Sequence, residues 1–174
     1  MTRFFQTLAI TIFGLGITAC SNDSPVSPSP DSVQTFTANL NATNEVPPIT
    51  GAEAGVSGTA RLTFNLTRSA SGAIDTATLD LTVNASGFPN GTALTNAHIH
   101  SGGAGANGAV FVGSGIAAGE ITFPTGSGTF TKTAIAVSAD QASAILANPA
   151  SFYFNIHTAS HPDGVARGQL VREQ

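Results

Sequence analysis

Cysteine and charge are both scarce in this chain. Cys20 is the single cysteine among 174 residues, so an intramolecular disulfide is excluded. Charged residues make up only 9% of the sequence, the formal net charge is −4, and Lys and Arg form no cluster. Without a basic patch the chain lacks the electrostatic footprint of a nucleic-acid-binding protein, and we expect no nucleic-acid partner.

Several catalytic signatures are missing as well. No Gly-x-Ser-x-Gly turn is present, which argues against a serine hydrolase of that type. No pair of converging acids of the kind that glycosidases use is evident. The glycine-rich segment 101–108 lacks the Gly-Lys-Ser/Thr ending of a phosphate-binding loop. Binding is therefore expected rather than turnover.

The chain also lacks a long hydrophobic run. Its most apolar segment, 8–19, is shorter than the roughly 20 residues that span a bilayer, and it follows a short segment containing Arg3. A positive residue, a short apolar run and small residues at its end are typical of a signal peptide. We therefore expect residues 1–19 to be a cleaved signal.

The end of this segment resembles a bacterial lipobox. In Ile17-Thr18-Ala19-Cys20 an apolar residue stands three positions before the cysteine and a small one directly before it. The resemblance implies that the signal is that of a lipoprotein and that Cys20 is acylated, which would anchor the chain to a lipid membrane. The expected location is extracytoplasmic, in the bacterial cell envelope, and Ser21 favours an outer membrane. An ordinary secretory signal is the alternative.

A tether and one domain are expected after the signal. Residues 20–32 are rich in Ser and Pro, a composition typical of an extended linker. Residues 33–174 contain enough apolar sequence for one domain with its own core. The domain boundaries predicted from the sequence are thus 1–19, 20–32 and 33–174.

Short runs that alternate apolar and polar residues predict an all-β domain. Such runs cover 34–40, 60–67, 76–83, the segment around His98 and His100, 109–112, one or two runs within 119–137, 151–158 and 165–172. Ser138 and Gln141 form the capping box of one short connecting helix that ends before Asn148-Pro149. We expect a Greek-key-like β-sandwich or flattened barrel of seven to nine strands.

All four histidines lie near two of these strands. His98 and His100 alternate with Ile99, so both imidazoles point to one face of their strand. His157 lies on the polar face of the later strand 151–158, and His161 lies in the turn that follows it. If the two strands come together, three imidazoles converge on one polar patch backed by an apolar core.

A His-x-His strand with a distant histidine is a known way to bind copper or zinc. The metal hypothesis makes His98, His100 and His157 the ligands, with His161 as a fourth. Asn96, Asn155 and Thr158 would lie behind them, where Asn96 or Asn155 could orient a ring. By analogy with the His-x-His strand of copper/zinc superoxide dismutase, a weaker alternative is a redox metalloenzyme.

Two other interpretations of the histidines stay open. Asn96, Asn155 and Thr158 are suitable partners for a structural hydrogen-bond network, in which case the chain would be a structural or adhesive surface domain. Alternatively, Tyr153 could supply the aromatic surface of a carbohydrate or small-ligand patch.

Structural roles are expected for two charged residues. Glu45 is expected to be a turn residue that pairs with Arg61 or Arg167, and Arg167 is expected to brace loop carbonyls.

Four motifs in order resemble the CHRD (chordin-type) domain: Glu45-Val46-Pro47-Pro48, His98-Ile99-His100, Asn155-Ile156-His157-Thr158 and Ala166-Arg167-Gly168-Gln169-Leu170. The resemblance covers residues 36 to 171. It implies an extracellular-type domain such as those of chordin, which binds bone morphogenetic proteins, or of bacterial secreted proteins without an assigned enzymatic activity. For a single bacterial domain it implies no growth-factor partner, and the partner stays unknown.

Overall fold

The computed structural model describes residues 32–174. The expected signal peptide, Cys20 and the tether up to residue 31 lie outside the described residues. Buried residues of the described part of the chain form one hydrophobic core cluster, so we expect residues 33–174 to fold as a unit.

Ten strands form one antiparallel sheet. In chain order they are β1 (Val33–Asn41), β2 (Ser57–Arg68), β3 (Ile74–Ser86), β4 (Thr92–Ser101), β5 (Val110–Gly113), β6 (Thr122–Phe123), β7 (Ser127–Val137), β8 (Phe152–Thr158), β9 (Ala166–Gln169) and β10 (Val171–Arg172). Eight of them follow the path β5-β4-β8-β9-β1-β2-β3-β7, while β6 pairs with β4 and β10 with β1. The all-β expectation is confirmed: the eight strands of the path lie within the expected seven to nine, and the other two, β6 and β10, are each two residues long.

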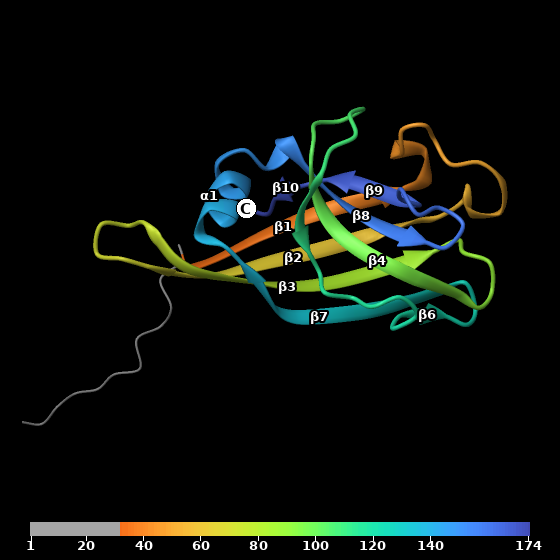
Figure 1. The fold of residues 1–174 in the computed structure, drawn as a ribbon, viewed down its shortest axis with the longest axis horizontal. Coiled ribbons are helices and arrows are strands. Elements are labelled where there is room, and N and C mark those ends of the chain that lie inside the picture. The colour runs from red at the N-terminus through yellow and green to blue at the C-terminus, as the bar shows by residue number, and fades with distance from the viewer. Residues whose placement is uncertain (1–31) are drawn as a thin grey trace, which may run out of the picture.

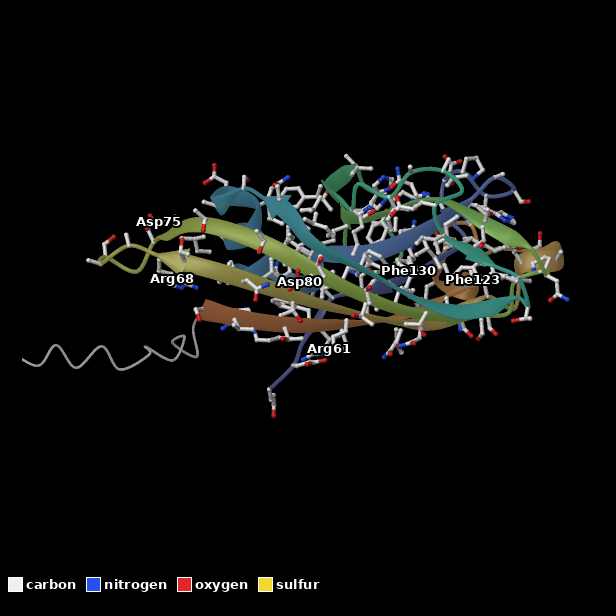
Figure 2. All side chains as sticks on the ribbon, turned by 90° about the horizontal axis from the view of Figure 1, so that it is seen from below. Arg61, Arg68, Asp75, Asp80, Phe123 and Phe130 are labelled. Carbon is white, nitrogen blue, oxygen red and sulfur yellow. The ribbon has the colours of Figure 1, made fainter. Side chains whose placement is uncertain are left out.

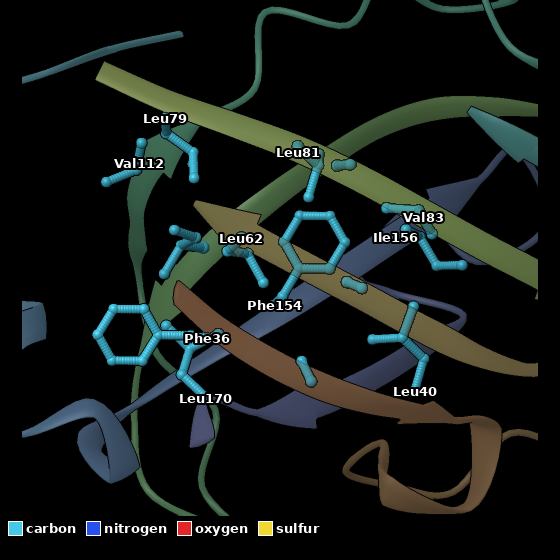
Figure 3. Packing of buried hydrophobic residues seen from close by; sticks show 14 of the residues in the cluster. Phe36, Leu40, Leu62, Leu79, Leu81, Val83, Val112, Phe154, Ile156 and Leu170 are labelled. Atoms are coloured by element: carbon cyan, nitrogen blue, oxygen red, sulfur yellow. The ribbon is translucent and has the colours of Figure 1, made fainter. Parts of the chain in front are cut away.

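The sheet curls so that its two halves face each other, as in a nearly closed barrel. Figure 1 shows β4 and β8 in front of β1, β2 and β3, and Figure 3 shows the two sets of strands crossing with side chains between them. Phe36, Leu62 and Leu81 of β1, β2 and β3 belong to the same buried cluster as Phe154 and Ile156 of β8. Burial of this apolar surface is the main force that holds the two halves together.

Strands β2 and β3 form a hairpin, in which they pair from Ser57↔Ser86 to Arg68↔Ile74. Alternate residues of both strands are buried, as period-two patterning requires. Figure 2 labels one exposed and one buried side chain of the sheet: Arg61 of β2 is exposed, whereas Phe130 of β7 is buried.

The connections contain four short helical segments: η2 (Ala42–Asn44), η3 (Gly51–Glu53), α1 (Ala139–Ala147) and η4 (Pro149–Ser151). Ser138 and Gln141 form the expected capping box at the start of α1, which buries Ala142 and Ile145. Within residues 32–174 no helix has the length and apolar character needed to cross a membrane.

We expect Leu62→Ala to lower the free energy of unfolding of residues 33–174 by about 2–5 kcal/mol, because it removes fully buried methyl groups and leaves a cavity. Val33→Ala is the matched control, since Val33 is 42% exposed and should change stability by no more than about 0.5 kcal/mol. Urea unfolding measures both. Equal effects would contradict the assignment of Leu62 to the core.

Candidate metal centre

The pairing of β4 with β8 brings the histidines together. The antiparallel register places His98 opposite Asn155 and Asn96 opposite His157, so His98 and His157 are diagonal neighbours on one face. Ile99 follows His98 and Ile156 precedes His157, so both point to the opposite face of the sheet, where they are buried in the core. The convergence expected from the two sequence segments is confirmed.

Three imidazoles form one compact group. The ring centroids are 4.9 Å apart for His98 and His157, 5.4 Å for His98 and His100, and 5.6 Å for His100 and His157. One nitrogen from each ring lies within 4.8 Å of the other two. We call His98, His100 and His157 the histidine triad.

Backbone carbonyls determine which nitrogen of two rings carries the proton. The Nδ1 of His100 is 3.0 Å from the oxygen of Gly108, and the Nδ1 of His157 is 3.0 Å from the oxygen of Pro162. A carbonyl oxygen only accepts hydrogen bonds, so in the neutral rings Nδ1 donates and Nε2 has a free lone pair. This arrangement is typical of metal-binding histidines.

Two nitrogens of the triad are in direct contact, and a third has no partner among the described residues. The Nε2 of His157 is 3.2 Å from the Nδ1 of His98, which donates a hydrogen bond to it in the metal-free protein. The Nε2 of His100 is buried and has no hydrogen-bond partner among the described residues. The 3.2 Å separation is close to the roughly 3.4 Å between two nitrogen ligands of one tetrahedral zinc ion.

Burial favours the neutral form of all three triad imidazoles. Burial, followed by the charges that His157 and His100 would carry, lowers the pKa of His98 to about 4. Burial is also the main cause that lowers the pKa of His100 and of His157. Neutral imidazoles are the form that binds metal, so burial of the triad favours metal binding.

Tyr153 packs its ring against the face of the His100 imidazole. Its ring stacks on the imidazole with centroids 5.0 Å apart and an interplanar angle of 6°. Its hydroxyl accepts a hydrogen bond of 3.2 Å from the N–H of Gly108, the residue whose carbonyl oxygen contacts His100. Residue 108 must be glycine, because a Cβ there would lie 1.4 Å from the oxygen of Ser101.

Arg167 braces the loops around the triad. Its Nη1 donates to the oxygen of Ala106 and to Oδ1 of Asn107, and its Nε donates to the oxygen of Asn44 at 2.7 Å. The guanidinium carbon lies 4.7 Å from the centre of the Tyr153 ring. Arg167 therefore makes a cation–π contact with Tyr153, which in turn stacks on His100.

Glu45 is the anionic neighbour of this arginine. Its Oε2 lies 3.7 Å from the Nε of Arg167, whereas Arg61 pairs with Glu173. Burial raises the pKa of Glu45 to about 7, against the opposing charges of Arg167 and His161. Its Oε1 has no hydrogen-bond partner among the described residues.

His161 lies outside the triad. Its Nδ1 forms a short hydrogen bond with the Oε2 of Glu53, which also accepts a 2.8 Å hydrogen bond from the hydroxyl of Thr158. The N–H of His161 donates to the same hydroxyl. Its role as a fourth ligand stays a prediction. Glu53 had no local signal in the sequence, because its partners are more than 100 positions away.

Among the described residues, no hydrogen bond joins Asn96 or Asn155 to a histidine ring. The Oδ1 of Asn96 accepts the N–H of Ala97 at 2.8 Å. Asn155 is buried and packs against Gly164, where a Cβ would come within 2.2 Å of its amide nitrogen. Among the described residues, the groups that orient two of the rings are instead the carbonyls of Gly108 and Pro162.

The triad lies in a cleft of about 790 Å³. Its walls are formed by three segments: residues 45–50, residues 107–110 and the turn 160–164. All three triad histidines and Tyr153 line it. A metal ion held by the triad would therefore face a space of the size that small ligands occupy.

Comparison with known proteins gives one match. A family model of the CHRD domain matches residues 36–170, which include the triad, Glu45 and Arg167. No curated protein and no solved structure matches the chain.

His98 should contribute a loss of stability to the metal-free domain as the pH falls from about 6.5 to about 4. In that window the unfolded His98, with a pKa near 6.5, takes up a proton that the folded one, with a pKa of about 4, does not. His98→Ala should reduce this loss. Glu45, whose raised pKa acts in the opposite direction, is present in both proteins, so their difference reports the imidazole.

Urea unfolding of residues 33–174 at pH 7.5, 6, 5 and 4.5 measures this dependence, with chelator present throughout. Parallel curves for the wild type and His98→Ala would contradict the burial of a neutral imidazole at this position.

Proposed function

Since the chain belongs to the CHRD domain family, we propose that this member is an envelope-anchored binding module that holds a transition metal, copper or zinc, through His98, His100 and His157. One observation carries the proposal. One nitrogen from each triad ring lies within 4.8 Å of the other two, and backbone carbonyls hold Nδ1 of His100 and His157 so that their Nε2 atoms carry the lone pairs.

A purely structural role accounts less well for the same residues. A buried hydrogen-bond network should satisfy its members, because a buried polar atom without a partner costs about 1–3 kcal/mol. The Nε2 of His100 has no such partner among the described residues. A metal ion at the centre of the triad would supply one.

The superoxide dismutase-like alternative lacks a specific supporting observation. The cleft is lined by Glu45 and Asp163, and no Lys or Arg belongs to its described lining. Such a lining does not concentrate an anionic substrate. Binding without turnover is therefore the function that the site favours.

The proposed location follows from the lipobox-like segment. Acylation of Cys20 would anchor the domain to a membrane outside the cytoplasm, and residues 21–32 would separate it from the lipid surface. The domain would then meet metal ions of the envelope rather than those of the cytoplasm.

We expect residues 33–174, purified without a His-tag, to bind one copper or zinc ion and to melt at a higher temperature when metal is added, because a ligand of the native state alone stabilises it. Loss of a triad ligand in His100→Ala should weaken binding by at least about 100-fold, more than the 10–100-fold typical of outer-shell changes. Isothermal titration with each metal measures the affinity.

His161→Ala is the matched control, since it removes an imidazole of the same cleft that lies outside the triad. It should retain binding within about threefold. Equal losses in both variants would make His161 a ligand, and no binding by the wild type would refute the metal proposal.

The full chain expressed in a bacterium should incorporate a labelled fatty acid and sediment with membranes. Cys20→Ser should abolish both, because the thiol is the acylation site. Fatty-acid labelling and membrane fractionation test this, and label retained in Cys20→Ser would contradict it. Because the change lies outside the domain, metal binding by the variant should be unchanged.

A further inference from the structure

The cleft above the triad has features that the metal alone does not require. Four large hydrophobic residues are exposed in the described part of the chain, and two of them, Val46 and Val110, line this cleft. Val46 is 39% exposed and Val110 is 53% exposed. Pro47, Pro48 and Ile49 extend the same apolar wall.

This wall is held in place before any ligand arrives. The side chain of Asn107 donates a 2.8 Å hydrogen bond to the oxygen of Val46, which ties the wall to the loop that contains Gly108. The N–H of Ile49 donates to the oxygen of Ala42. A preformed wall loses little entropy when a ligand packs on it.

The number of protein ligands leaves room for another donor. Among the described residues, the group that can hold a metal has three members, all histidines. Zinc centres with three protein ligands keep a fourth position for water or another small molecule. Since all three histidines line the cleft, this position would face it.

The charges of the lining restrict the kind of donor. The lining carries the carboxylates of Glu45 and Asp163 and, among its described residues, no Lys or Arg. Asp163 offsets part of the charge of a divalent ion, and no Lys or Arg of the described lining adds to it, so the centre would attract an anion less than a basic site would. A neutral donor fits this environment.

We propose that the centre is open and that its cleft binds a small neutral nitrogen or sulfur donor with an apolar body, the donor on the metal and the body against Val46 and Val110. This inference rests on the proposed function, because the donor needs the metal. The cleft between residues 45–50 and 107–110 would then be a ligand site in addition to the metal site.

The test uses the full chain, solubilised in mild detergent and loaded with one equivalent of copper(II). Imidazole, 4-phenylimidazole and azide are titrated separately, and electron paramagnetic resonance follows the copper coordination. The wild type should bind 4-phenylimidazole about 10-fold more tightly than imidazole, and azide more weakly than either.

The double variant Val46→Ser/Val110→Ser should reduce the preference for 4-phenylimidazole to about threefold or less. Both ligands meet the same copper ion in every variant, so a change in their affinity ratio reports the wall alone. Val33→Ser is the matched control, because Val33 is 42% exposed but does not line the cleft. It should keep the wild-type ratio.

Three results would overturn the inference while leaving metal binding intact. These are no change of the copper spectrum with any ligand, an affinity ratio that is the same in the double variant, or azide binding as tight as that of 4-phenylimidazole. If the wild-type chain does not take up copper at all, the proposed function fails first, and this inference fails with it.

Discussion

The site depends on the register in which β4 pairs with β8. With His98 opposite Asn155, the diagonal position belongs to His157, and residues 98, 100 and 157 share one face. A shift of β4 by one residue would turn His98 and His100 into the core and expose Ile99. Burial of the apolar face of β4 and β8 therefore determines which residues lie together on the polar face. Burial of hydrophobic side chains stabilises the fold and, through the register, determines where the nitrogens meet.

The loops hold the triad histidines that β4 and β8 bring together. The carbonyls of Gly108 and Pro162 select the Nδ1–H form of two rings, and Tyr153 contacts both Gly108 and His100. Arg167 in turn contacts Tyr153 and the loop before Gly108. The four motifs that resemble the CHRD domain thus contribute residues to one cleft or to its support.

The sequence predicts the strands and the triad for a simple reason. Alternation of side chains is a local property, so it places His98 and His100 on one face and gives the all-β class without coordinates. The ring-orienting carbonyls and the pair of Glu53 with His161 could not be predicted in this way. They depend on contacts between loops distant in sequence, and a backbone carbonyl or a carboxylate in a glycine-rich loop carries no pattern. Asn96 and Asn155 were plausible ring partners by type, but the loops bring carbonyls to the rings.

A single crystallographic measurement tests the central claim, that the triad nitrogens enclose one metal position. Crystals of residues 33–174 soaked in zinc or copper would be measured at the absorption edge of the metal. We expect one anomalous peak about 2.0–2.1 Å from the Nδ1 of His98 and the Nε2 atoms of His100 and His157. No peak among these three atoms at saturating metal, or a peak on other side chains only, would contradict the account.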